Sequence, residues 1–197
     1  MLLGHKVAIV TGGGTGIGNA IGANLARNGA RVVIASRNPA HLEATKADFE
    51  KLGLPVLGLP MDLRKKEDIQ RTVAEVAAKW GAIHILVNNA GISGLSRTDD
   101  PDDGMWYDIL DTNLSGLYQI TKAVLKHMPD HSGGRIINIS SVLGKFGVAG
   151  YAAYCATKHG VIGFTRALAL EVVDRGITVN TVCPGWVDTE MARQGIN

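Results

Sequence analysis

Short apolar runs that alternate with amphipathic segments are the feature of this sequence that most limits its fold. The runs are rich in valine and isoleucine and nearly continuous in hydrophobicity, which is typical of parallel strands that are covered on both faces. There are six of them, KVAIVT (6–11), ARVVIAS (30–36), PVLGLPMD (55–62), HILVNNA (84–90), RIINISS (135–141) and ITVNTVC (177–183).

The amphipathic segments between these runs carry apolar residues at helical spacing, and each predicts a helix that packs on the sheet. They span residues 17–28, 65–80, 105–127 and 151–174. The alternation predicts an α/β fold: a Rossmann-like, doubly wound parallel sheet of six strands, with right-handed crossovers and helices on both faces. No linker-like or low-complexity segment divides the chain, so we expect residues 1–197 to form a single domain.

The charge pattern argues against nucleic-acid and membrane partners. The 197 residues carry a net charge of +2, and basic and acidic residues are interspersed, so there is no basic stripe for nucleic acid. No apolar stretch reaches the roughly 18 residues of a membrane span, and the first residues lack the pattern of a signal peptide. We expect Cys155 and Cys183 to be reduced thiols in a cytoplasmic protein.

Two short stretches could suggest a metal site, and neither has the required spacing. HMPDH (127–131) contains a close pair of histidines, but the proline between them indicates a helix end. TDDPDDG (98–104) is acidic but lacks the EF-hand spacing, and its carboxylates suit a solvated loop that caps the next helix. We therefore expect no metal.

A glycine-rich turn, TGGGTGIG (11–18), joins the first predicted strand to the first predicted helix. Gly12 would allow the sharp turn, Gly16 would let the backbone approach a pyrophosphate, and Gly18 would let the helix pack close to the sheet. Free N–H groups and the helix dipole would then meet the phosphates of a dinucleotide. The spacing Gly-x-x-x-Gly-x-Gly differs from the G-x-G-x-x-G fingerprint, so a purely structural turn is the alternative.

The end of the second run bears on which dinucleotide would bind. An NAD site usually has an acidic residue about 20 residues beyond the glycines, where it accepts from the ribose hydroxyls. Here that place holds Ser36, followed by Arg37. An arginine can pair with a 2′-phosphate, so the sequence favours NADP(H) over NAD(H); an exposed loop arginine is the alternative.

Tyr154 and Lys158 lie four residues apart in YCATK (154–158), inside a predicted helix. Side chains at this spacing share a helical face, so the ammonium can lie near the phenol. A nearby cation favours the phenolate and would lower the tyrosine pKa from its usual value of about 10. A surface tyrosine packed on a lysine stem is the other interpretation.

Over nearly its whole length the sequence resembles the short-chain dehydrogenase/reductase family. The family's motifs occur in their usual order, and six in order make chance resemblance very improbable. They are TGGGTGIG (11–18), NNAG (88–91), the asparagine of DTNLSG (111–116), the serine of INISS (137–141), YCATK (154–158) and PGWVDT (184–189). Within the family, the stretch 134–189 looks most like 3-oxoacyl-thioester reductases.

The resemblance implies a hydride-transferring oxidoreductase that acts on a small-molecule carbonyl or secondary alcohol. Tyr154 would exchange a proton with the substrate oxygen, Lys158 would hold the nicotinamide ribose, and Ser141 would hydrogen-bond the reacting oxygen. Asn113 would support a water-linked proton path behind Lys158. Tyr151 is excluded as the catalytic tyrosine because Cys155, not lysine, lies four positions after it.

The family pattern also implies a set of cofactor contacts, in which Asp62 meets the adenine amino group with Leu63 beside it. Residues 184–189 would hold the nicotinamide ring and its carboxamide. The full predicted set is Gly12, Thr15, Gly16, Ile17, Gly18, Arg37, Asp62, Leu63, Asn89, Gly91, Tyr154, Lys158, Pro184, Gly185, Val187 and Thr189.

Members of the family usually continue past the position of Asn197 with a substrate-covering segment and a seventh strand, which we expect this chain to lack. Besides an active enzyme, a sensor or scaffold that binds NADP(H) without turnover and an inactive fragment are therefore alternatives. The family usually pairs subunits through the helices corresponding to 105–127 and 151–174. The resemblance thus implies a homo-oligomer, either a dimer or a tetramer.

Overall fold

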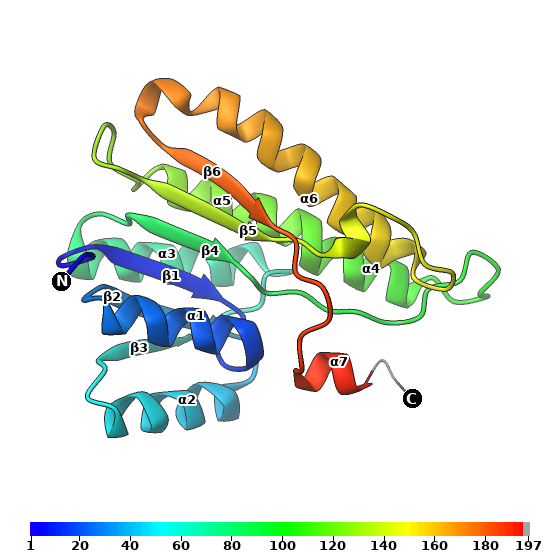
Figure 1. Cartoon of the computed structure of the whole chain (residues 1–197), viewed down its shortest axis with the longest axis horizontal. Coiled ribbons are helices and arrows are strands. Elements are labelled where there is room, and N and C mark those ends of the chain that lie inside the picture. The colour runs from blue at the N-terminus through cyan, green and yellow to red at the C-terminus, as the bar shows by residue number, and fades with distance from the viewer. Residues whose placement is uncertain (195–197) are drawn as a thin grey trace.

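The computed structural model describes residues 1–194, in which six strands form one parallel sheet (Figure 1). The strands lie in the order β3-β2-β1-β4-β5-β6, so the chain winds outward from β1 in one direction and then restarts at β4 on its other side. The strands are β1 Val7–Thr11, β2 Arg31–Ser36, β3 Val56–Pro60, β4 Ile85–Asn88, β5 Arg135–Ile139 and β6 Thr178–Val182.

Helices cover both faces of the sheet, which confirms the doubly wound α/β fold. Helices α1 and α2 pack on one face, and α3, α5 and α6 pack on the other (Figure 1). The helices are α1 Gly16–Arg27, α2 Pro39–Lys51, α3 Lys66–Trp80, α4 Gly104–Leu110, α5 Gly116–Leu125, α6 Ala152–Glu171 and α7 Glu190–Gln194.

All six predicted strands form, each somewhat shorter than its apolar run, whereas α2, like the short α7, lies outside the four predicted helical segments. Asn38 caps this helix by accepting a 2.9 Å hydrogen bond from the backbone N–H of Ala40. The buried residues of α2 are Leu42, Thr45 and Phe49. So few buried positions give a weak apolar period, which explains why the pattern does not predict this helix.

The sheet separates two apolar clusters, and its central strands contribute to both. Ile9 and Val33 point toward α3, α5 and α6, whereas their neighbours Val10 and Ile34 point toward α1 and α2. Every residue of β1 is buried. Burial on both faces is the physical reason for the near-continuous hydrophobicity of these runs.

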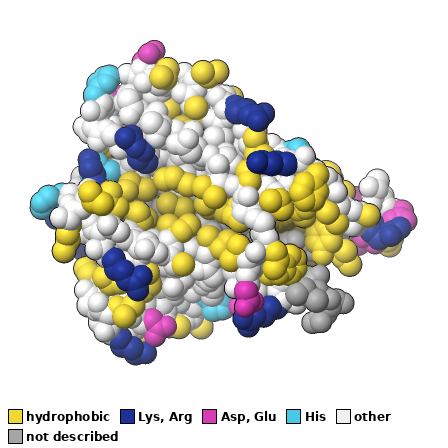
Figure 2. All heavy atoms as spheres, viewed as in Figure 1, with side chains coloured by type: hydrophobic (Ala, Val, Ile, Leu, Met, Phe, Trp, Pro, Cys, Tyr) yellow, Lys and Arg dark blue, Asp and Glu magenta, His cyan; other side chains and the backbone are white. Residues whose placement is uncertain are grey.

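One part of the sheet is open on the side of α1. Among the described residues no helix covers β4, β5 and β6 on this side, and Figure 2 shows a band of apolar side chains exposed there. Ile137 of β5 is partly buried, and Val182 of β6 is 48% exposed. This apolar band begins beside Ile21 and Leu25 of α1, which are also only partly buried.

The predicted helix over 105–127 forms, but a π-helical turn interrupts it. Residues Asp111–Ser115 are π-helical and join α4 to α5 without a break in the chain direction. Such turns hold one residue more than an α-helix would and are frequent at functional sites. The turn contains Asn113, which is buried.

Buried polar side chains connect the second half of the sheet to α5 and α6. The amide nitrogen of Asn88 donates to Asn138 Oδ1 at 2.8 Å and to Thr121 Oγ1 at 2.9 Å. The amide of Asn138 donates in turn to Thr165 Oγ1 at 2.8 Å, and the Thr181 hydroxyl meets the same oxygen at 2.6 Å. These bonds fix the carboxyl end of β5 against α6, which carries the tyrosine and lysine of YCATK.

Within residues 1–194, no helix is long and apolar enough to cross a membrane. The same residues contain no cluster of three or more histidine, cysteine, aspartate or glutamate side chains placed to hold a metal ion. Cys155 is buried, Cys183 is partly exposed, and both are free thiols. In the acidic stretch at 98–104, the Asp102 side chain accepts a 2.9 Å hydrogen bond from the N–H of Gly104, the first residue of α4, whereas the N-cap residue Asp103 makes no side-chain capping bond.

Candidate active site

The glycine turn lies where the carboxyl end of β1 meets the start of α1. Gly12 and Gly16 have positive φ angles of 63° and 53°, which other residues adopt only with strain. A Cβ at Gly18 would overlap the carbonyl oxygen of Gly12. The first turn of α1 can therefore pack directly on the strand exit, as the sequence predicts, only with glycine at 18.

Hydrogen bonds tie this turn to the end of β4. The Thr11 hydroxyl oxygen accepts from the backbone N–H groups of Asn89 and Ala90, both at 3.0 Å. The Asn89 amide donates to the carbonyl oxygens of Thr11 at 3.0 Å and Gly12 at 3.2 Å. The Asn89 amide, predicted as a cofactor contact, thus also holds the glycine turn in place.

The start of α1 fits an anionic phosphate group. Thr15 is the N-cap residue, yet its side chain makes no capping hydrogen bond, and the first turn contains no acidic residue. The N–H groups at this end are therefore available to a ligand, and the helix dipole makes the position electropositive. Thr15 and Gly16 are both exposed, so an anion can reach them.

The segment after β6 crosses the sheet edge to reach α1 (Figure 1). The Pro184 carbonyl accepts from the Val142 N–H at 2.9 Å, which holds the segment beside the end of β5. A Cβ at Gly16 would come within 3.2 Å of the Thr189 side chain. Val187 and Thr189 line a groove of about 540 Å³ together with residues of α1, whereas Gly185 is exposed before it.

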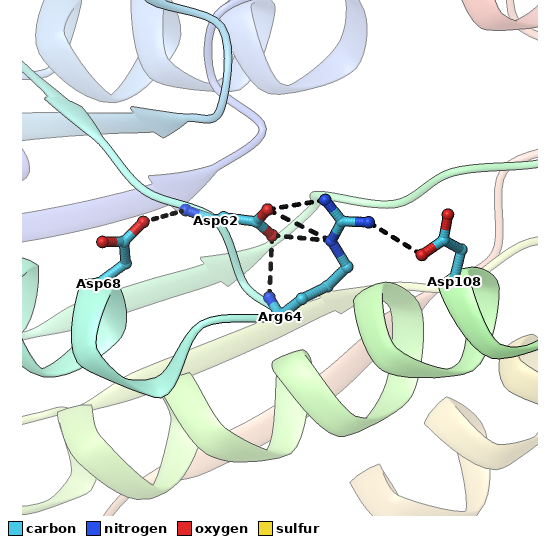
Figure 3. Close-up of polar contacts among 4 residues, drawn as sticks. All are labelled: Asp62, Arg64, Asp68 and Asp108. Atoms are coloured by element: carbon cyan, nitrogen blue, oxygen red, sulfur yellow. Dashed lines mark hydrogen bonds and ion pairs between the residues drawn. The ribbon is translucent and has the colours of Figure 1, made fainter.

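Residues predicted for the adenine end follow β2 and β3. Arg37 is exposed and makes no ion pair with any described residue. The Asp62 carboxylate pairs with Arg64, which also reaches Asp108 on α4 (Figure 3). Leu63 is buried against Gly116 of α5, so its side chain packs into the protein core; the prediction of a cofactor contact can apply only to its backbone.

Ser141, Tyr154 and Lys158 come together at the carboxyl end of β5. Ser141 begins a short 3₁₀ turn, Val142–Gly144, and its Oγ accepts from the Leu143 N–H at 3.1 Å. Tyr154 and Lys158 lie in α6, with Lys158 Nζ 5.4 Å from the centre of the tyrosine ring. Lys158 is buried, and its Nζ donates to the Ile139 carbonyl at 3.0 Å.

The pKa of Tyr154 lies above its ordinary value, opposite to the direction that the sequence alone indicates. Burial raises this pKa because it disfavours the phenolate, and a hydrogen bond with the Ser141 side chain lowers it by less. Burial also lowers the pKa of Lys158 to about 8. The phenol is therefore protonated at neutral pH and suited to donate a proton.

Asn113 joins this group from the π-helical turn. Its Oδ1 accepts from the Ile92 N–H at 2.8 Å, and its amide donates to the Ile92 carbonyl at 2.9 Å. A Cβ at Gly91 would come within 3.2 Å of Asn113 Oδ1 and 3.5 Å of Lys158 Nζ. A side chain at position 91 would thus crowd both Asn113 and Lys158, while the water-linked path implied for Asn113 stays a prediction.

Three residues of the site are absent from the sequence-based set. Thr11 fastens the glycine turn, Thr157 meets the Asn113 amide at 3.4 Å, and Arg64 holds Asp62. Thr11 is the first residue of TGGGTGIG, and Arg64 follows Asp62 by two positions. The contacts of Thr11 and Thr157 join segments that are far apart in the sequence, so these positions alone give no sign of them. The contact of Arg64 with Asp62 is local, but two residues of opposite charge at this spacing do not by themselves indicate a binding site.

Known proteins share both the sequence pattern and this arrangement. The family model described as short chain dehydrogenase matches residues 6–196. A 3-oxoacyl-[acyl-carrier-protein] reductase, FabG, of Pseudomonas aeruginosa is 43% identical over 194 residues, which cover 98% of this chain and 78% of that protein. The chain belongs to the short-chain dehydrogenase family. Membership confirms the resemblance seen in the motifs, and the protein is an oxidoreductase.

Solved structures agree with this assignment. A tryptophan variant of actinorhodin polyketide ketoreductase, crystallised with NADPH, matches with a TM-score of 0.90 and 43% identity, over 96% of this chain and 73% of that one. Levodione reductase matches with a TM-score of 0.93 and 31% identity, over 98% of this chain and 76% of that one. This short-chain dehydrogenase therefore shares its fold with carbonyl-reducing relatives.

The buried lysine makes a prediction about stability. The pKa of Lys158 is about 8 in the folded chain and 10.5 ordinarily, so the unfolded chain binds more protons between these values. Wild-type stability should therefore rise relative to Lys158→Met as pH increases, by about 2 kcal/mol between pH 7.5 and 9.5. Urea unfolding of both proteins at the two pH values measures this difference.

The control is Lys122→Met, which removes a lysine from the exposed surface of α5. If wild type and Lys158→Met change in parallel across this pH range, the ammonium is not desolvated in the folded chain.

Proposed function

We propose that this short-chain dehydrogenase is an NADP(H)-dependent reductase that converts the ketone of a 3-oxoacyl thioester to a secondary alcohol. The observation that carries the proposal is the convergence of Ser141, Tyr154 and Lys158 beside a helix start that fits a phosphate group. The substrate class comes from the relatives, which include a 3-oxoacyl-[acyl-carrier-protein] reductase and a polyketide ketoreductase.

In this proposal the protein's own residues place the substrate oxygen and provide its proton. Ser141 donates a hydrogen bond to the ketone oxygen, and the neutral phenol of Tyr154 gives that oxygen a proton as it becomes an alkoxide. Lys158 carries positive charge at Nζ beside the tyrosine ring, which stabilises the phenolate left behind. When bound, the nicotinamide supplies the hydride to the carbonyl carbon.

In this proposal, residues along the carboxyl edge of the sheet hold the cofactor. The N–H groups at the start of α1 would hold the pyrophosphate, Asp62 the adenine amino group and Arg37 the 2′-phosphate. Lys158 would hold the nicotinamide ribose, and residues 184–189 would border the nicotinamide ring. Arg37, which is exposed and makes no ion pair with residues 1–194, supports NADP(H), and the ketoreductase solved with NADPH supports it independently. No observation favours the alternatives, a non-catalytic binder or an inactive fragment.

Turnover should depend on Tyr154 and not on Tyr151. Tyr154→Phe removes the proton donor and should lower NADPH oxidation with a short 3-oxoacyl thioester by at least a thousandfold, while NADPH binding stays within about threefold. Tyr151, just before α6, is the matched control, and Tyr151→Phe should keep most of the activity. The opposite ranking of the two variants would show that the catalytic register is wrong. A wild-type chain that binds NADPH but reduces no ketone would support the non-catalytic alternative.

Cofactor preference should depend on Arg37. A charge-assisted hydrogen bond is worth about 1.5–3 kcal/mol, so Arg37→Ala should weaken NADPH binding by roughly 10- to 150-fold. NADH, which lacks the 2′-phosphate, should bind nearly as before. Fluorescence titration with both cofactors measures the ratio, and equal losses for both would contradict the assignment.

We also propose a cytoplasmic homo-oligomer that forms through α4, α5 and α6. Tyr107, Tyr118 and Leu170 on these helices are 60%, 48% and 79% exposed, and the Tyr118 ring meets Phe164 edge-on. A subunit that packs on these three helices would remove these apolar side chains from water, which is a favourable change. Sedimentation velocity at micromolar concentration should give a dimer or larger species that Tyr118→Glu with Leu170→Glu dissociates. A wild-type monomer would refute the interface, and export of the native protein from cells would refute the location.

A further inference from the structure

The ends of β2 and β3 place a cation and a carboxylate next to each other at the adenine end of the site. Ser36 pairs with Pro60 in the sheet, and the Met61 N–H donates to the Ser36 carbonyl at 3.0 Å. Arg37 and Asp62 therefore leave neighbouring strands at the same level. If Arg37 binds a 2′-phosphate, that phosphate lies close to the Asp62 carboxylate.

A phosphate and a carboxylate in this position repel each other. The Asp62 side chain is only 13% exposed, so water screens its charge poorly. Without compensation, the carboxylate that suits the adenine amino group would weaken binding of the 2′-phosphate. Binding of both groups therefore calls for a second cation next to Asp62.

Arg64 is this cation, and its guanidinium forms several hydrogen bonds with the Asp62 carboxylate (Figure 3). Its Nε lies 3.2 Å from both carboxylate oxygens of Asp62, and one terminal nitrogen donates to Oδ2 at 2.9 Å. The Arg64 backbone N–H adds a bond to Oδ1 at 3.0 Å. Three N–H donors thus make four contacts with a carboxylate that has about four acceptor sites. Because Nε is shared between the two oxygens, an adenine amino group could replace one of its two long contacts.

Neighbouring elements fix the guanidinium in this orientation. The other terminal nitrogen of Arg64 donates at 2.9 Å to Asp108, which is 53% exposed and belongs to α4. The Asp62 N–H donates to Asp68 Oδ2 at 3.1 Å (Figure 3). Leu63, between Asp62 and Arg64, packs on Gly116 of α5. The loop that carries Asp62 and Arg64 is therefore held on the same long helix that contains Asn113.

We propose that Arg64 is a positioning residue for NADP(H): it orients the Asp62 carboxylate toward the adenine and offsets its charge, so that adenine recognition and a 2′-phosphate are compatible. This inference rests on the proposed NADP(H) dependence. It assigns the preference for the phosphorylated cofactor to two arginines, one that binds the phosphate and one that neutralises its neighbour. The electrostatic setting agrees with it, because Arg64 holds the pKa of Asp62 below its ordinary value, with a smaller contribution from Arg37.

The test uses ligands that reach only the adenine end, adenosine 2′,5′-bisphosphate and adenosine 5′-monophosphate, with calorimetric titration of the full chain. Arg64→Met should weaken the bisphosphate by at least tenfold and the monophosphate by no more than about threefold. Adding Asp62→Asn to Arg64→Met should recover most of the bisphosphate affinity, because the uncompensated charge is then gone. A merely structural role for Arg64 would not produce this recovery.

Arg97→Met is the matched control, because Arg97 makes a similar pair of hydrogen bonds with Asp99 in an exposed loop. This variant should leave both affinities unchanged. Equal weakening of the two ligands by Arg64→Met, or tighter monophosphate binding, would overturn the inference; the second result would mean that Arg64 competes with adenine. If Arg64→Met does not fold, Asp62→Asn alone decides: the ratio of bisphosphate to monophosphate affinity should rise, and a fall would overturn it.

The proposed function and this inference fail in different ways. A wild-type chain with no preference for the bisphosphate, or an Arg37→Ala variant that keeps the preference, contradicts NADP(H) recognition itself. A wild-type preference that Arg37→Ala abolishes and Arg64→Met leaves intact contradicts only the role of Arg64.

Discussion

The close approach of Gly18 to the Gly12 carbonyl is the contact on which the rest of the site depends. It brings the start of α1 onto the exit of β1, and the Asn89 amide holds the same carbonyl from β4. Because β1 and β4 are the strands at which the chain reverses its winding direction, a ligand at this edge can contact both halves of the fold. The proposed phosphate-binding end and the proposed catalytic end therefore lie along the same edge of the sheet, on either side of this junction.

Much of the fold follows from the sequence because its central strands are buried on both faces. A short, continuously apolar run such as KVAIVT predicts a buried strand, and the structure contains one there. The glycines at 12, 16 and 18 likewise predict the tight turn that follows it. Helix α2 escapes prediction because most of its surface is solvated. The π-helical turn escapes it because the cause is tertiary: Asn113 bonds to the backbone of Ile92, which lies 21 residues away.

The candidate site, like the fold, can be predicted from the sequence only in part. Family motifs identify Ser141, Tyr154 and Lys158, and the structure brings them together. The motifs do not predict whether the pKa of Tyr154 is raised or lowered, because the shift depends mainly on how deeply the side chain is buried. Arg64 could not be recognised from spacing, because Asp108 lies 44 residues further along the chain and meets it only after folding.

The π-helical turn at Asp111–Ser115 determines where this long helix can lose a residue. Because the turn holds one residue more than an α-helical turn, removing one residue from it would leave a continuous α-helix, and the buried faces of α4 and α5 would keep their relative orientation. Each residue of an α-helix advances the chain by about 100° of rotation, so a deletion that the turn does not absorb would move either Ile109 or Ile120, both fully buried, out of the core. Single-residue length differences among relatives inside 104–125 should therefore be confined to the π-helical turn.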